Sequence, residues 1–220
     1  MKRALTLVTV SALIGACASG PPVPDWESNA KTSMDHSVAA YLTGDTRLAD
    51  SDFERARSEI TRTGRIDLLG RAELVRCAAR VASLVFEPCA GFEKLRADSL
   101  APERAYADYL AARVQPQDIA LLPPQHHAVA AANLSAENAV AAVRGIDDAL
   151  SQLVAIGVLF QAGRAHPTAI ALAADTASAQ GWRRPLLGWL NVQLALAEKA
   201  GDTGESARLR RRIAVVQGDK

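Results

Sequence analysis

The 220-residue sequence is poor in aromatic residues, in β-branched runs and in net charge. Phenylalanine, tryptophan and tyrosine make up 5% of the residues, and no useful length of chain alternates apolar with polar residues. Strands favour aromatic and β-branched residues, whereas helices favour the alanine and leucine that abound here. The composition therefore predicts an all-α fold.

Histidine and cysteine, which often bind metals or act in catalysis, are also scarce, with four and three residues. The adjacent His126 and His127 would point about 100° apart on a helix, which suits a surface better than a shared metal ion. His166 has no acid or cysteine close to it in sequence. We therefore predict no metal site, no cofactor and no catalytic cluster, although a catalytic group assembled across the fold stays open.

The N-terminal leader is the most specific feature that the sequence does contain. Basic Lys2 and Arg3 precede a largely apolar run at residues 4–14, and small Gly15 and Ala16 follow it. This order of charge, apolar run and small residues is typical of a secretion signal. The apolar run is too short to span a bilayer.

Residues 13–17, Leu-Ile-Gly-Ala-Cys, resemble the lipobox at which bacterial lipoproteins are cleaved and lipidated. The resemblance implies a lipoprotein signal peptide at residues 1–16. It further implies a lipidated Cys17 with a linker at 17–24, and a periplasmic all-α domain at 25–220. The membrane would then be a partner of the protein through its N-terminal lipid.

The residue after the cysteine indicates which membrane is reached. Ala18 stands where lipoproteins kept in the inner membrane usually carry Asp, so the resemblance implies the periplasmic face of the outer membrane. An ordinary cleaved signal peptide is the alternative, because residues 16–18 also form an A-x-A site. Either cleavage removes two of the 25 basic residues and none of the 24 acidic ones. The resulting charge near −1 argues against a nucleic-acid partner.

Two cysteines remain after lipidation, Cys77 and Cys89. Cys77 lies on an apolar helical stripe with Leu74 and Val81, and Cys89 follows Pro88 just past that helix. An even pair in an oxidising compartment usually bonds, so a Cys77–Cys89 disulfide is predicted, with two buried free thiols as the alternative. No histidine lies near either cysteine in sequence, which argues against a zinc site.

Glycine and proline divide the body into helical segments joined by short turns, which predicts antiparallel helical hairpins. The expected helices are 26–42, 45–63, 67–85, one from Ala101 limited by Pro116, 135–162 with Gly145 as a candidate break, and one that begins at Pro185.

Two patterns resemble tetratricopeptide repeats. Gly44-Asp45 followed by Ala49, Phe53 and Ala56 is similar to the turn and second helix of that family, although its first-helix signature is missing. The Ala-Gly pairs at 162–163 and 200–201 recur with a spacing slightly longer than the family's usual length of about 34 residues. The resemblance implies a degenerate tetratricopeptide-like body, an irregular α-solenoid or a bundle.

Two features near the C-terminus are candidate partner-binding residues. Arg208, Arg211 and Arg212 belong to the one dense charge run, which is either a solvated helix face or a docking patch for an acidic group. Trp189 stands at the edge of an apolar helical stripe. It either completes the core or floors a partner groove.

These features together predict a membrane-anchored periplasmic lipoprotein that acts in protein interaction or scaffolding during cell-envelope biogenesis. Helical repeats offer extended binding surfaces, and another envelope protein is the expected partner. The alternative is an envelope enzyme that acts on peptidoglycan through an active site dispersed along the chain.

Overall fold

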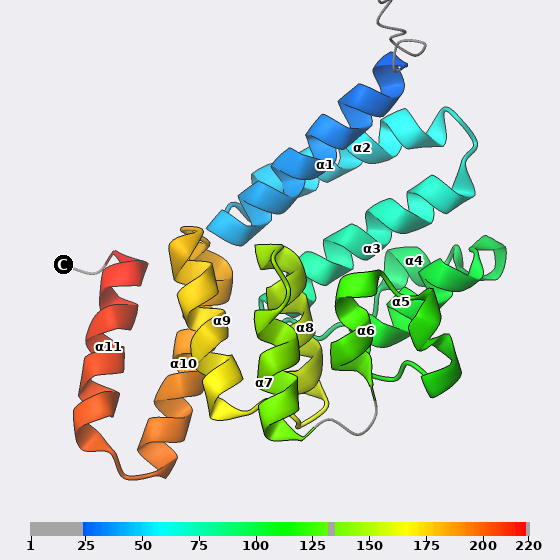
Figure 1. Ribbon diagram of the computed structural model, residues 1–220. Coiled ribbons are helices and arrows are strands. Elements are labelled where there is room, and N and C mark those ends of the chain that lie inside the picture. The colour runs from blue at the N-terminus through cyan, green and yellow to red at the C-terminus, as the bar shows by residue number, and fades with distance from the viewer. Residues whose placement is uncertain (1–23, 132–134, 219–220) are drawn as a thin grey trace, which may run out of the picture.

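The computed structural model describes residues 24–131 and 135–218, and every regular element in these ranges is a helix (Figure 1). The all-α prediction is therefore confirmed. The α-helices are α1 (Asp25–Thr43), α2 (Thr46–Thr61), α3 (Ile66–Ala82), α4 (Ala90–Glu93), α5 (Ala101–Leu110), α6 (Pro124–Ala130), α7 (Ala136–Arg144), α8 (Ala149–Gln161), α9 (Pro167–Ala179), α10 (Arg183–Lys199) and α11 (Thr203–Gln217). Two 3-10 helices are η1 (Arg96–Asp98) and η2 (Pro116–Leu121).

The first two helices lie side by side above the rest of the body (Figure 1). Gly44 ends α1 at a positive φ of 110°, which an L side chain rarely adopts, and the Asp45 carboxylate accepts a hydrogen bond from the Leu48 amide at the start of α2. Ser37 on α1 donates to the Ala49 carbonyl on α2 at 2.7 Å. The turn and the close contact thus follow from local sequence, while membership of a repeat family stays a prediction.

Helix α3 occupies the centre and packs against α1, α2, α5 and α8. It ends at Ala82, earlier than predicted, because Leu84 takes a positive φ of 61°. Cys77 on α3 is bonded to Cys89 ahead of α4, with their Cα atoms 5.9 Å apart, so the predicted disulfide is confirmed. The bond ties the loop after α3 back onto the helix.

Helix α8 forms the core of the middle of the molecule, since all of its residues 152–159 are buried. A Cβ atom at Gly157 would lie 2.5 Å from the Val81 carbonyl oxygen, so α8 crosses α3 at a point where only glycine fits. Buried Gln152 donates to the Val143 carbonyl and accepts a hydrogen bond from Thr176. This amide joins α7, α8 and α9.

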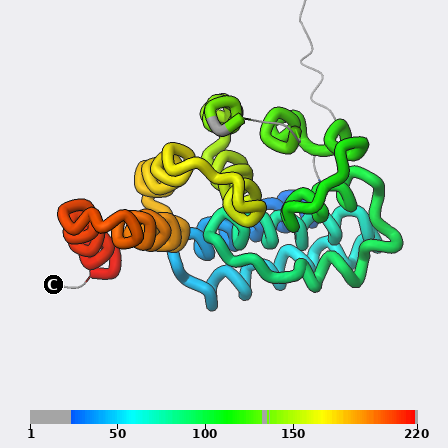
Figure 2. The backbone as a smooth tube through the Cα atoms, turned by 90° about the horizontal axis from the view of Figure 1, so that it is seen from below, coloured from blue at the N-terminus to red at the C-terminus, as the bar shows by residue number. Residues whose placement is uncertain are grey.

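The last three helices continue the array, and α11 lies at one end of it (Figures 1 and 2). Gly163 and Gly201 take similar positive φ values of 69° and 72°, so the two Ala-Gly pairs found in the sequence mark equivalent turns. Helix α10 begins at Arg183 rather than at Pro185, because proline is tolerated anywhere in the first turn. Trp182 is its N-cap residue.

The Arg184 side chain joins this C-terminal part to the N-terminal helices. Its guanidinium donates to the carbonyls of Tyr41 and Gly44 and to the Thr46 hydroxyl, and it stacks over the Tyr41 ring at 4.3 Å. None of the helices within 24–131 and 135–218 is both long and apolar enough to cross a membrane.

Candidate binding groove

The predicted lipidation site lies outside the described part of the chain. Cys17, the signal peptide 1–16 and the linker up to residue 23 belong to this undescribed end, so their assignment stays a prediction. Pro24, the last linker residue, leads directly into α1.

Trp189 does not floor a groove. The side chain has no exposed surface, its ring meets the Phe160 ring edge-on at 5.7 Å, and its indole N–H donates to the Ala82 carbonyl at 3.1 Å. The partner-binding interpretation is corrected, because a residue with no accessible area cannot contact a partner. The other interpretation, a core residue, is the one that its burial supports.

The arginine run lies on α11. Arg208 forms a two-point ion pair with Glu205 one turn earlier, and Arg210 pairs with Glu198 on α10. Arg211 is exposed and Arg212 is half-buried. Ion pairs with neighbouring surface acids are what a solvated face shows, and a docking role for Arg208, Arg211 and Arg212 stays a prediction.

Two adjacent apolar hollows lie along α3 and share Arg71 and Val75 in their linings, and we call the two hollows together the α3 groove. The hollow toward α1 has a volume of about 350 Å³ and the hollow toward α5 about 420 Å³. The apolar lining of the first is Trp26, Ala30, Met34, Ile60, Leu68, Ala72 and Val75. That of the second is Leu74, Val75, Pro102, Tyr106, Leu121, Leu122 and Pro123.

The groove exists because α3 is apolar on more than one side. Leu68, Ala72 and Val75 follow each other at intervals of four and three, which places them on one face of the helix. The stripe of α3 through Leu74 and Val81 is a different one, and it packs into the core. Val75 is left 39% exposed and Leu121 38% exposed, so the groove is an open apolar surface.

One ion pair stands where the two hollows meet. Arg71 Nε donates to Glu103 Oε1 at 2.7 Å. The Arg71 side chain is 57% exposed, whereas the Glu103 side chain is 5% exposed. Glu103 Oε2 is buried and has no hydrogen-bond partner among the described residues. A buried carboxylate oxygen without a donor is costly, so this atom is a candidate for pairing with a bound molecule.

The remaining cations of the groove are neutralised by neighbouring acids. Arg65 Nε and Nη2 both donate to the Asp67 carboxylate, which lowers the pKa of Asp67 to about 2. Lys31 donates to Asp35 at 2.6 Å. Arg65 thus donates two hydrogen bonds to its acid, whereas Arg71 donates only one to a described residue, from Nε to Glu103.

An aromatic cluster supports the α5 wall of the groove. The Tyr106 ring is stacked near Tyr109, and both pack around His126, whose Nδ1 lies 3.2 Å from the Tyr109 hydroxyl oxygen. The expectation of a surface histidine pair is wrong for His126, which is 1% exposed. His127 points elsewhere, and its Nε2 lies 2.8 Å from the Leu122 carbonyl oxygen.

Burial lowers the pKa of His126 to about 4, from about 6.5 in an unfolded chain. Between about pH 6.5 and 4, His126 is protonated in the unfolded state but neutral in the folded state. The free energy of unfolding therefore falls as the pH drops through this range. We expect a loss of about 2 kcal/mol between pH 7 and pH 5, measured by urea unfolding at each pH. In the His126→Phe variant this part of the pH dependence should vanish, and an unchanged slope would contradict the assignment.

A more polar cavity of about 290 Å³ lies on the other side of α3, beside the disulfide. Buried Glu73 lines it together with Arg57, whose Nε lies 3.4 Å from Glu73 Oε1. Burial raises the pKa of the Glu73 carboxyl. A Cβ on Gly91 would overlap this carboxylate, so Gly91 makes room for it.

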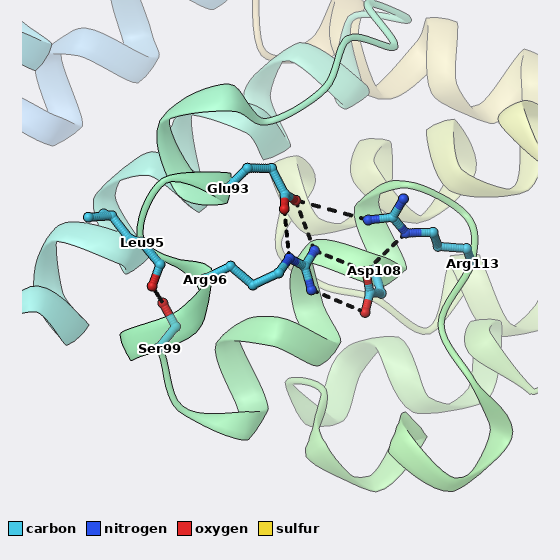
Figure 3. Close-up of polar contacts among 6 residues, drawn as sticks. All are labelled: Glu93, Leu95, Arg96, Ser99, Asp108 and Arg113. Atoms are coloured by element: carbon cyan, nitrogen blue, oxygen red, sulfur yellow. Dashed lines mark hydrogen bonds and ion pairs between the residues drawn. The ribbon is translucent and has the colours of Figure 1, made fainter.

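A charge network joins α4 to α5 (Figure 3). Arg96 donates to Glu93 at 2.7 and 2.9 Å and to Asp108 at 3.0 Å, and Arg113 donates to the same Asp108 at 3.0 Å. Acids and bases alternate in the network, so its charges are largely neutralised internally. Its geometry accounts for the placement of the short helices rather than for a ligand.

No group of three or more His, Cys, Asp or Glu residues is arranged to hold a metal ion within the described ranges. No protein-family model, curated protein or solved structure matches this chain.

Proposed function

We propose that the protein is an outer-membrane lipoprotein whose periplasmic all-α body binds another envelope protein in the α3 groove, as an interaction or scaffolding factor in envelope biogenesis. The lipobox-like residues 13–17 support the anchor. The observation that carries the binding role is the α3 groove itself, where Val75 and Leu121 leave apolar surface open. Apolar depressions with a few polar groups are typical binding sites.

The position of the groove suits a partner at the membrane surface. Trp26, at one end of the groove, lies in the first turn of α1. Seven residue steps from Cys17 to Pro24 span at most about 25 Å. A lipid on Cys17 would therefore keep the α1 end of the groove within a few nanometres of the bilayer.

The enzyme alternative has less support. Glu73 is a buried carboxyl with a raised pKa in a cavity, as a general acid would be. The other charged groups that line its cavity are all basic, namely Arg57, Arg76, Arg80 and Lys94. The groove, by contrast, offers a larger and more apolar surface.

The anchor is tested by a Cys17→Ser substitution. The serine variant lacks the thiol that accepts the lipid, so we expect the body to move from the membrane fraction to the soluble periplasm. Cell fractionation and intact-mass spectrometry measure this change. The Cys77→Ser variant serves as a control, because it should stay with the membrane. An unmodified Cys17 in the native protein would refute the anchor.

A further inference from the structure

We propose that the α3 groove takes an extended apolar polypeptide segment whose main chain pairs with Arg71 and Glu103. This inference rests on the proposed binding role of the groove and specifies its occupant. The partner contributes one residue whose N–H donates to Glu103 Oε2 and whose C=O accepts from Arg71. Apolar side chains on either side of this residue fill the two hollows.

The pairing of the Arg71 and Glu103 side chains is incomplete. Glu103 uses Oε1 for Arg71, and its buried Oε2 meets no donor within the described residues. Arg71 uses Nε, and no described residue accepts from its two Nη atoms. The pair thus offers one unmet acceptor and several unmet donors at the same place. Each unmet group is worth pairing, because a hydrogen bond to a charged group is stronger than a neutral one.

An extended polypeptide can satisfy both the unmet acceptor of Glu103 and the unmet donors of Arg71. In an extended chain, the N–H and C=O of one residue point to the same side, which is how a strand exchanges two hydrogen bonds with one residue opposite. A residue in this conformation presents a donor to Glu103 and an acceptor to Arg71 together. A fatty acyl chain has no donor along its length, so it would leave Glu103 Oε2 unpaired.

The Arg71–Glu103 pair lies where the two hollows of the groove adjoin. Both hollows include Arg71 in their lining, and apolar residues extend from it toward Trp26 on one side and Leu121 on the other. A segment that crosses the groove therefore has apolar surface before and after its paired residue. Alternate side chains of an extended segment point to the same face and can enter the groove.

Glu103 Oε2 is buried in the unbound protein, so a peptide N–H reaches it only when neighbouring side chains move. The Arg71 side chain is more than half exposed and can turn without disturbing the core. As it turns, its Nη atoms remain available to the incoming carbonyl. Binding would thus add two hydrogen bonds to the peptide, at Glu103 Oε2 and at an Arg71 Nη atom, and the bond between Arg71 Nε and Glu103 Oε1 can re-form once the segment is bound.

The test uses the full-length protein in detergent and a phage-displayed library of random nonapeptides. We expect selection to enrich apolar peptides. Fluorescence anisotropy with the selected peptides, each carrying a fluorescent label, then gives their affinities. Two outcomes overturn the proposal. One is that no peptide is enriched. The other is that oleate displaces the peptides from the Glu103→Gln variant as well as it displaces them from the wild type.

Two sets of changes distinguish the main-chain pairing from the apolar contacts of the groove. Val75→Asp should abolish binding, whereas the matched Val215→Asp, at a valine 77% exposed on α11, should leave it unchanged. Glu103→Gln retains the shape but replaces the unmet acceptor, and it should weaken binding at least about tenfold. N-methylation of the central peptide residue should weaken its binding to the wild type by a similar factor. It should change binding to the Glu103→Gln variant little.

The possible results lead to different conclusions. If Val75→Asp has no effect, the groove is not the binding site and the proposed function loses its support. If Val75→Asp abolishes binding while Glu103→Gln and N-methylation do not weaken it, the groove binds but the main-chain pairing is refuted. Circular dichroism of each variant checks that the fold is retained.

Discussion

Replacing Trp189 with alanine is expected to destabilise the folded protein by about 4 kcal/mol. The ring is fully buried in the main core, it contacts Phe160, and its N–H satisfies the Ala82 carbonyl at the end of α3. Alanine would leave a cavity and an unpaired carbonyl, and both are costly in a close-packed interior. Equilibrium urea unfolding measures the loss.

Trp26→Ala provides the control for this substitution. Trp26 is half-buried in the α3 groove and outside the main core, so its removal should cost about 1 kcal/mol or less. A Trp189→Ala protein with wild-type stability would mean that α10 does not pack on α3 as described. Because Trp189 acts through packing, any effect on partner binding should follow the loss of folded protein.

Removal of the Cys77–Cys89 bond has the second large expected effect, a loss of about 3 kcal/mol. The two cysteines are 12 positions apart, so the bond restricts a short loop of the unfolded chain. In the folded protein it also holds the segment between α3 and α4 beside the Glu73 cavity. We expect the Cys77→Ala, Cys89→Ala double variant to unfold at a lower urea concentration than the wild type.

Reduction supplies an independent measurement of the same bond. Dithiothreitol should bring the wild type close to the double variant and leave the double variant unchanged. Alkylation before and after reduction counts the thiols released. Wild-type protein whose unfolding does not respond to reductant, although both thiols become reactive, would contradict a stabilising role for the bond.

The features that could be predicted from the sequence are those with local causes. Gly44 and Asp45 set the turn between α1 and α2, and Gly145 marks the break between α7 and α8. The Ala-Gly pairs at 162–163 and 200–201 set equivalent turns. Backbone conformation and capping decide these points within a few residues, so one stretch of sequence contains the information.

The depth of a side chain depends on distant elements and could not be predicted in the same way. Trp189 occupies the edge of its own stripe, and it becomes central only because α10 packs beside the end of α3. His126 is buried because Tyr106 and Tyr109 pack around it from α5. In both cases the deciding neighbours belong to other helices.

The α3 groove was missed for a related reason. The spacing of Leu68, Ala72 and Val75 was visible, but a second apolar face on a helix is usually covered. Nothing in the sequence shows which face remains open. The Arg71–Glu103 pair joins residues on two different helices, α3 and α5, and no motif connects them.

The contact of Arg184 with the turn after α1 makes the two ends of the body interdependent. The last carbonyls of a helix lack partners in the next turn. At the end of α1 the Tyr41 carbonyl accepts from the Gly44 N–H and also from Arg184 on α10, and the Gly44 carbonyl accepts from Arg184. A fragment that stops before α10 would lack this donor and the cation over the Tyr41 ring. We therefore expect the helices that line the groove to be less stable in a fragment that lacks α10. Helix α10, late in the sequence, thus helps to fix α1, the helix that forms one wall of the groove.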